Sequence, residues 1–524
     1  MTGTPGEEPV VNAAVPEREQ YADHVGKIAR GAGVSSVGQG VGRVLAFATQ
    51  VILARLFGAA QLGFYVLGIS LMQGANVLST FGMDSVVVRY VAHYRAEGDA
   101  ARVRGTILLV LGVTFGLSFA LSALTFAGAG FLADVVFGKP FFEDVIRAFS
   151  VATPFFTLMK VALYATQGFK TVKYATYVEE VLRPLINLVL VVVFYLLGAQ
   201  ILGAIAAYAL SMAIAAVIAL HYLRRLFPKL LDRATPAKFE ARKLVGASGP
   251  IMIMKTTSYV NAWAIIWVLG AFVSARDVGI FNAAFRTAVL SGLVLMAFGG
   301  IFAPIVSDLY KRGSLDQLGR LYKDVSRWTF TGSLAVFLLT AFLAKDVLAI
   351  FGEEFVVGWP VLIVVATAQL FSSSVGVAGR ILTMTGNEKR AMWQRIIATA
   401  VALAGGAALV PLYGIIGAAV AAATGLVAVN ALSLFAVRQL LGFWPYNRKY
   451  LKPLAAGFLA SGALLAAQWT LQPSGGIVAI AVLSPIFLAL FTAFNVALRL
   501  SESDQQLLGA VRSAMRLRIS GRHK

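Results

Sequence analysis

Seven basic residues lie inside stretches of sequence that are otherwise apolar and long enough to form helices. They are Arg43, Arg147, Lys160, Arg183, Lys255, Arg286 and Arg380. A charged side chain in the centre of a bilayer costs roughly 3 kcal/mol on insertion scales, so it usually faces a water-filled cavity or an opposite charge. Arginine binds phosphate through two parallel hydrogen bonds, and lysine binds it as a point charge. These residues therefore indicate a site for an anionic ligand.

Polar side chains at helical spacing accompany several of these charges. At about 100° per residue, Gln39, Arg43 and Gln50 fall on one face of a helix. Arg43, Lys255 and Arg286 have no acidic residue three or four positions away, which favours a cavity over a pair within the helix. The predicted ligand-binding cations are Arg43, Lys255, Arg286 and Lys160, and the predicted polar lining comprises Gln39, Gln50, Gln73, Asn76, Asn282 and Arg183.

The remaining basic residues have plainer interpretations. Arg147 and Arg380 lie near the ends of apolar stretches, where long side chains extend to the membrane surface. Arg183 follows Glu179 and Glu180 by about one helical turn, so an ion pair within the helix and a role in the site both remain open.

The elements that must position these residues are transmembrane helices. The chain is 58% hydrophobic and 13% charged, with a mean hydropathy of +0.78, which places it in a bilayer. Spans of about 20 apolar residues recur fourteen times. They are 31–56, 62–82, 105–132, 143–167, 176–197, 200–223, 246–270, 277–302, 326–345, 359–384, 390–411, 415–437, 453–470 and 475–498.

The loop charges give this map an orientation. Of the 45 lysines and arginines, 34 fall in the tails and loops on the side of the N-terminus and four on the opposite side. Cytoplasmic loops carry the excess of basic residues, so both termini are predicted to be cytoplasmic. The net charge of +20 is then a property of loops that face anionic lipid, and no nucleic-acid partner is expected.

Internal similarity divides the helices into two repeats. The segment 56–65 (LFGAAQLGFY) resembles 272–281 (FVSARDVGIF) at an offset of 216 residues, and 202–207 resembles 416–421 at 214. Six crossings per repeat give both repeats the same orientation. The predicted parts are a disordered tail 1–28, an N-lobe 29–223, a basic linker 224–245, a C-lobe 246–437, an extra helix pair 438–498 and a basic amphipathic tail 499–524.

The sequence lacks the residue patterns that metal binding, nucleotide binding and covalent catalysis require. The chain has no cysteine, and its four histidines do not cluster, so no metal site is expected. No phosphate-binding loop of the G-x-x-x-x-G-K-[ST] type occurs, and no cofactor is expected. The short outer loops lack catalytic constellations, which argues against an enzyme that polymerises or ligates saccharides. A proton or sodium gradient, the membrane potential or the substrate itself remain as energy sources.

Five motifs between about 25 and 500 carry a resemblance to a known family. They are 54–65 (ARLFGAAQLGFY), 81–90 (FGMDSVVVRY), 307–313 (SDLYKRG), 351–355 (FGEEF) and 410–419 (VPLYGIIGAA). With these motifs the sequence resembles the polysaccharide (O-antigen type) flippase family of the multidrug/oligosaccharidyl-lipid/polysaccharide exporter superfamily. The resemblance implies a V-shaped, two-lobed transporter that alternates access through a central cavity.

The resemblance also implies a substrate. Such a protein moves a polyprenyl-diphosphate-linked oligosaccharide from the inner to the outer leaflet of the bacterial cytoplasmic membrane, with glycosyltransferases and a polymerase as pathway partners. Two alternatives stay open, a flippase for a peptidoglycan-precursor lipid and an ion-coupled multidrug exporter. In the peptidoglycan branch an extra helix pair forms a groove for the lipid tail. A drug exporter is expected to carry carboxylates in mid-membrane, and these are scarce here.

Overall fold

A computed structural model describes the backbone of residues 14–232, 234–471, 476–498 and 504, and within these residues the regular structure is entirely helical. The α-helices are α1 (Ala14–Thr80), α2 (Met83–Ala96), α3 (Ala100–Ala127), α4 (Ala129–Phe131), α5 (Phe142–Gln167), α6 (Lys173–Ala175), α7 (Arg183–Leu196), α8 (Ile201–Leu226), α9 (Ala241–Phe272), α10 (Ala275–Val289), α11 (Leu293–Lys311), α12 (Leu315–Phe342), α13 (Ala344–Ala349), α14 (Trp359–Val375), α15 (Ala378–Met384), α16 (Glu388–Leu441), α17 (Leu451–Leu471) and α18 (Ile477–Ala497). The π-helical segments are η1 (Leu132–Val136) and η2 (Thr176–Leu182), and the 3-10 segments are η3 (Pro228–Leu230), η4 (Leu290–Gly292), η5 (Glu353–Gly358) and η6 (Arg448–Tyr450).

The described residues contain ten helical stretches that are long and apolar enough to cross a membrane. This confirms the prediction of an all-α, multi-pass membrane protein. Two of the stretches, Gly38–Thr80 and Glu388–Leu441, each contain two of the predicted spans. In both, the chain changes direction at a glycine between the two spans. In α1 the change is at Gly58 (φ 78°, ψ 176°), and in α16 it is at Gly414 (φ 54°, ψ −129°). Glycine adopts these positive φ angles without the steric penalty that other residues meet.

The N-terminal segment differs from the expectation of disorder. Residues 1–13 lie outside the described residues, whereas residues 14–28 begin α1. The segment 17–20 (EREQ) consists of good helix formers, and Pro16 falls in the first turn, where proline is tolerated. Composition alone therefore underestimated the helix. Of the predicted amphipathic tail 499–524, only residue 504 is described.

The predicted repeat has a structural counterpart at two glycines. A Cβ atom on Gly63 would lie 1.7 Å from the carbonyl oxygen of Ala275, and one on Gly279 would lie 2.0 Å from that of Ala59. Gly63 and Gly279 are 216 residues apart, and each packs against the helix that carries the other. Such a reciprocal contact is expected where equivalent parts of two like-oriented repeats meet.

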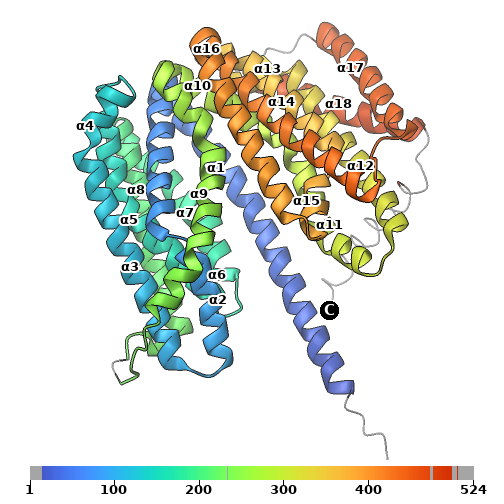
Figure 1. Cartoon of the computed structure of the whole chain (residues 1–524). Coiled ribbons are helices and arrows are strands. Elements are labelled where there is room, and N and C mark those ends of the chain that lie inside the picture. The colour runs from blue at the N-terminus through green and yellow to red at the C-terminus, as the bar shows by residue number, and fades with distance from the viewer. Residues whose placement is uncertain (1–13, 233, 472–475, 499–503, 505–524) are drawn as a thin grey trace, which may run out of the picture. The chain divides into compact units, whose positions relative to one another are not determined.

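The chain divides into two compact units whose limits fall inside helices. The first lies within Met1–Thr49, Met72–Ala129 and Ile146–Thr256, and the second within Gln50–Leu71, Gly130–Val145 and Thr257–Lys524. The predicted lobes have other limits and remain a prediction. The extra helix pair belongs to the second unit, where α17 and α18 lie side by side (Figure 1). They pack against α12 through Leu334, Leu483 and Phe487.

Candidate functional site

The first pair of the site joins Lys255 of α9 to Asp84 of α2. Helix α1 ends at Thr80, and the turn that follows has positive φ angles at Phe81 (49°) and Gly82 (75°). Asp84 therefore lies in the first turn of α2, and only 6% of it is exposed. Its carboxylate contacts the Lys255 ammonium. The pairing depends on a close approach of α9, because a Cβ on Gly82 would lie 2.7 Å from the carbonyl oxygen of Ser248.

The second pair joins Lys160 of α5 to Glu179. The Lys160 ammonium lies 2.6 Å from a carboxylate oxygen of Glu179, and about a quarter of each side chain is exposed. Glu179 lies in the π-helical segment η2. A π-helical turn inserts an extra residue into a helix, which redirects the side chains that follow, and such turns are frequent at functional sites.

Tyr164 connects the two pairs. Its ring lies 5.8 Å from the Lys160 ammonium and 5.3 Å from the Lys255 ammonium, so both cations face one aromatic ring. Asp84, Lys160, Tyr164, Glu179 and Lys255 are called the charge cluster below. All five belong to the first unit.

Three further charges adjoin the charge cluster. The Arg183 guanidinium donates a 3.3 Å hydrogen bond to the Glu179 carbonyl. Helix α1 passes Glu180 closely, because a Cβ on Gly42 would lie 2.6 Å from its carbonyl oxygen, and the charge of Arg43 acts on the Glu180 carboxylate. Together Arg43, Arg183 and the two lysines supply four positive charges against three carboxylates. The cluster is therefore nearly neutral, with one cation in excess if every group is ionised.

The predicted polar lining is divided between the units. In the first unit, Asn76 is buried and donates a 2.8 Å hydrogen bond to the Thr157 hydroxyl. Gln73 is half-buried and Gln39 is exposed. In the second unit lies Gln50, whose side-chain oxygen is buried and has no hydrogen-bond partner within the described part of the chain.

Arg286 and Asn282 form a separate pair in the second unit. The Arg286 guanidinium donates a 3.2 Å hydrogen bond to the Asn282 oxygen, as their spacing of four residues on α10 allows. Asn282 is 3% exposed, and its amide nitrogen has no partner among the described residues. Arg286 itself is exposed.

Sequence reasoning missed the acidic half of the charge cluster. The sequence analysis assigns neither Asp84 nor Glu179 to the site, because each pairs with a lysine that lies far from it in the sequence. A spacing of three or four residues identifies charge pairs within one helix, and it cannot identify pairs between two helices. One available signal is the spacing of Asp84 from Gln73 and Asn76, which would place the three on one face of an uninterrupted helix. In the structure the turn at Phe81 and Gly82 separates them onto two helices.

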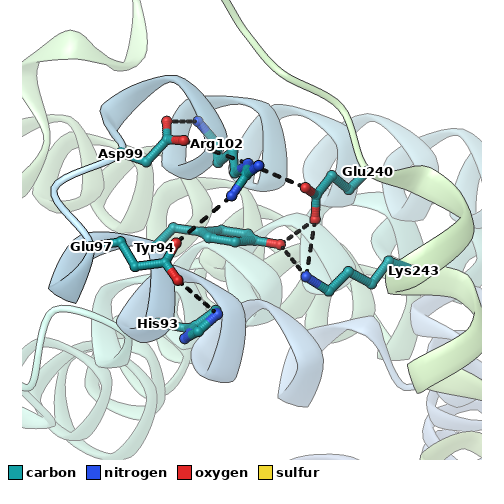
Figure 2. Close-up of polar contacts among 7 residues, drawn as sticks. All are labelled: His93, Tyr94, Glu97, Asp99, Arg102, Glu240 and Lys243. Carbon is teal, nitrogen blue, oxygen red and sulfur yellow. Dashed lines mark hydrogen bonds and ion pairs between the residues drawn. The ribbon is translucent and has the colours of Figure 1, made fainter.

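A second ionic network binds the linker residue Glu240 and the first turn of α9 to the end of α2 and the first turn of α3 (Figure 2). Tyr94 is 1% exposed and donates a hydrogen bond to Glu240. Lys243 lies 3.0 Å from the Tyr94 oxygen and 3.3 Å from the Glu240 carboxylate, and Arg102 lies 3.2 Å from the same carboxylate. Tyr94, Arg102, Glu240 and Lys243 are called the linker network.

Hydrogen bonding sets the protonation of the linker network. Burial, and then the hydrogen bond to Glu240, raise the pKa of Tyr94. The hydrogen bond from Tyr94 lowers the pKa of Glu240, and contact with Tyr94 raises the pKa of Lys243. Glu240 therefore stays an anion and Lys243 a cation over the neutral range.

A family model described as polysaccharide biosynthesis protein matches residues 28–310, which is more than half of the chain. The chain belongs to that family. The match includes every residue of the charge cluster and of the linker network. Together with its apolar helices, this makes the chain a multi-pass membrane protein of that polysaccharide biosynthesis family.

Two relatives with partial sequence similarity to this chain come from archaea. The chain is 24% identical over 198 residues to the probable low-salt glycan biosynthesis flippase Agl15 of Haloferax volcanii, and the alignment covers 38% of this chain and 42% of that relative. It is 20% identical over 435 residues to the uncharacterized membrane protein MJ1068 of Methanocaldococcus jannaschii, covering 79% and 85%. The alignment with the first relative thus spans less than half of that protein.

Solved structures share the fold. The lipid II flippase MurJ in an inward closed conformation has a TM-score of 0.70 and 13% identity, covering 88% of this chain and 98% of its own. An inward-facing multidrug resistance MATE family transporter of the MOP superfamily has a TM-score of 0.64 and 15% identity, covering 77% and 95%. At these identities the similarity concerns the multi-helix fold alone.

Proposed function

We propose that the chain is a flippase that moves a polyprenyl-diphosphate-linked oligosaccharide from the inner to the outer leaflet of the cytoplasmic membrane. The observation that carries this proposal is the charge cluster, in which two lysines face one tyrosine ring inside helices of a polysaccharide-biosynthesis transporter. Arg43 and Arg183 add two cations beside it. These groups match the phosphate oxygens of a lipid diphosphate.

Before substrate binds, the carboxylates of Asp84 and Glu179 balance the charges of the two lysines. Without a partner, a buried ammonium is strongly unfavourable, so Asp84 and Glu179 stabilise the lysines while no substrate is bound. An arriving diphosphate exchanges with these carboxylates for the lysines. Binding is then a replacement of one anion by another, which keeps affinity moderate and permits release on the other side. The released carboxylates can take up protons, which connects transport to a proton gradient.

An apolar groove on the second unit suits the lipid tail. It has a volume of about 470 Å³ and runs between α12 and α17, lined by Leu338, Phe342, Leu454, Phe458 and Gly462 among others. Its walls are almost entirely apolar, as a polyprenyl chain requires. The groove also favours the second candidate, a flippase for a peptidoglycan-precursor lipid, since that cargo carries the same kind of tail.

A multidrug exporter is the third candidate. The three carboxylates at and beside the charge cluster, Asp84, Glu179 and Glu180, would suit a cationic drug. The sequence-based argument against this function rests on the scarcity of such carboxylates. However, Asp84 and Glu179 are already paired with lysines, so a cationic drug would have to displace an internal cation and leave it unpaired. We further propose that the chain catalyses no covalent reaction.

The test is transport in proteoliposomes. A fluorescent polyprenyl-diphosphate oligosaccharide is placed in the membrane, and its passage between leaflets is followed by quenching with an impermeant reductant. The double variant Lys255→Met with Asp84→Leu removes a cation without leaving its partner unpaired, and should slow flipping about tenfold, equivalent to ~1.4 kcal/mol.

The matched control is Arg147→Gln. Arg147 is also a cation on α5, but it lies over the ring of Phe126 and outside the charge cluster, so its variant should flip at nearly the parent rate. Absence of flipping by the parent protein would overturn the proposed function. Transport of a cationic dye in place of the lipid would favour the drug exporter.

A further inference from the structure

The second unit contains a cavity of about 370 Å³ that belongs to neither the charge cluster nor the apolar groove. It lies between α9, α14 and the two arms of α16, before and after Gly414. Small residues leave the space, because Ala398 and Ala402 on one arm face Ala422 and Gly425 on the other. Its volume is within the usual range for small ligands, roughly 300–1,000 Å³.

The polar groups of the cavity form a distinct set. They are Asn261, Gln369, Arg395, Thr399, Asn430 and Ser433. The described lining thus offers amides, hydroxyls and one guanidinium, with no aspartate or glutamate. Amides and hydroxyls both donate and accept hydrogen bonds, which is what the hydroxyl groups of a sugar require.

Arg395 is the charged group of this set. Its backbone carbonyl accepts a hydrogen bond from Thr399, but its guanidinium has no hydrogen-bond or ion-pair partner among the described residues. Arg390, one and a half turns earlier on α16, instead donates a 3.0 Å hydrogen bond to Gln439 and does not line the cavity. A guanidinium without a protein partner, next to amides in an apolar wall, is available to an anionic ligand.

We propose that this cavity binds one acidic sugar residue, a monosaccharide that carries a carboxylate, and that the transported saccharide therefore contains such a residue. This rests on the proposed function for the identity of the cargo. A diphosphate carries at least two charges and is better matched by the four cations at the charge cluster. A cationic ligand finds no counter-charge in the cavity. One guanidinium with several amides matches a single carboxylate surrounded by hydroxyls.

The test measures binding alone, so that it is independent of flipping. The full-length protein in detergent is titrated with a soluble disaccharide that contains glucuronate, and separately with the neutral disaccharide that contains glucose instead. We expect the parent protein to bind the acidic sugar about tenfold more tightly, since a charge-assisted bidentate contact contributes ~1.4 kcal/mol or more. Arg395→Gln should abolish this preference and leave the binding of the neutral sugar unchanged.

Controls separate the cavity from general electrostatics. Arg390→Gln removes the same charge from the same helix and should keep the full preference. Gln369→Leu should weaken both sugars alike, because it removes a hydrogen-bonding group and no charge. Equal binding of the two sugars, binding of neither, or an equal loss in Arg390→Gln would overturn the proposal. So would displacement of the acidic sugar by inorganic pyrophosphate at lower concentration than by free glucuronate, because that would identify a diphosphate site. None of these results decides whether the protein flips lipids, which the proteoliposome assay measures.

Discussion

At the scale of single residues, the Lys255–Asp84 ion pair should stabilise the folded protein as well as form part of the proposed site. Asp84 is 6% exposed, so removing the Lys255 ammonium leaves its charge unpaired in a buried place. Lys255→Met alone should therefore lower the free energy of unfolding by up to about 3 kcal/mol, and Asp84→Leu added to it should restore much of the loss.

Thermal unfolding of the detergent-purified variants measures this coupling. Tyr164→Leu provides the comparison, because it removes the shared ring and leaves both ion pairs intact. If the double variant is no more stable than Lys255→Met, the two charges do not stabilise each other and the pair has no part in the site.

The linker network makes stability depend on pH. The pKa of Glu240 is lowered from about 4.5, so its contribution is complete above that pH and is lost as the pH falls through the lowered value. The pKa values of Tyr94 and Lys243 are raised from 10.0 and 10.5, so their contributions disappear as the pH rises through the raised values.

Glu240→Gln tests the acidic side of this dependence. The variant should melt at a lower temperature than the parent at pH 7, and the difference should vanish as the pH falls through the lowered pKa of Glu240, where the parent carboxylate is itself protonated. Asp232→Asn is the control, since Asp232 is in the same linker but accepts its hydrogen bonds from Ala234 and Thr235, outside the linker network. A difference that persists unchanged at acidic pH would show that the Glu240 charge does not hold the linker.

At the scale of helices, the reciprocal glycine contact restricts what side chains the two repeats tolerate. A methyl group on Gly63 would overlap the backbone carbonyl of Ala275, which cannot rotate away as a side chain could. Gly63→Ala should destabilise the protein by about 1–3 kcal/mol or more, although alanine is the better helix former.

Gly116→Ala is the matched substitution. Gly116 lies inside α3, and a Cβ there would meet nothing within 4 Å, so the change should be neutral or stabilising by up to about 1 kcal/mol. Melting temperatures of the two variants give the comparison. Equal effects would mean that helix propensity dominates and that α1 and α10 are not held in close contact.

The sequence predicts helices better than it predicts pairs between helices. Apolar length places twelve of the fourteen predicted spans on the ten long apolar helical stretches of the described residues, because a bilayer forces each crossing to be long and internally hydrogen-bonded. The predicted spans 176–197 and 246–270 coincide with helical segments outside those ten. The predicted breaks between neighbouring spans at 57–61 and 412–414 contain Gly58 and Gly414, where the backbone leaves the helical conformation. Lys160 and Lys255 were found as unusual charges, whereas their partners Glu179 and Asp84 depend on packing that no local pattern records. Arg395 lies near the start of the predicted span 390–411, so its position in the sequence predicts a charge of the preceding basic loop.

At the scale of the whole molecule, direction of transport depends on which loops face the cytoplasm. The asymmetry of lysine and arginine predicts that the loop 303–325 is cytoplasmic and that 346–358 lies outside. The sequence contains no cysteine, so one introduced cysteine is the sole thiol in the chain.

Two single-cysteine variants test the prediction. Ser314 lies in the first loop, and Val357, which is 64% exposed, lies in the second. In intact cells an impermeant maleimide should label Val357→Cys and leave Ser314→Cys unmodified until the cells are lysed, while the parent chain reports background. Labelling in the reverse order would place both termini outside. Asp84 of the charge cluster lies at the start of α2, on the side of the basic loop 83–104. With that side outside, the charge cluster would receive its ligand from the outer leaflet, which is the wrong leaflet for export.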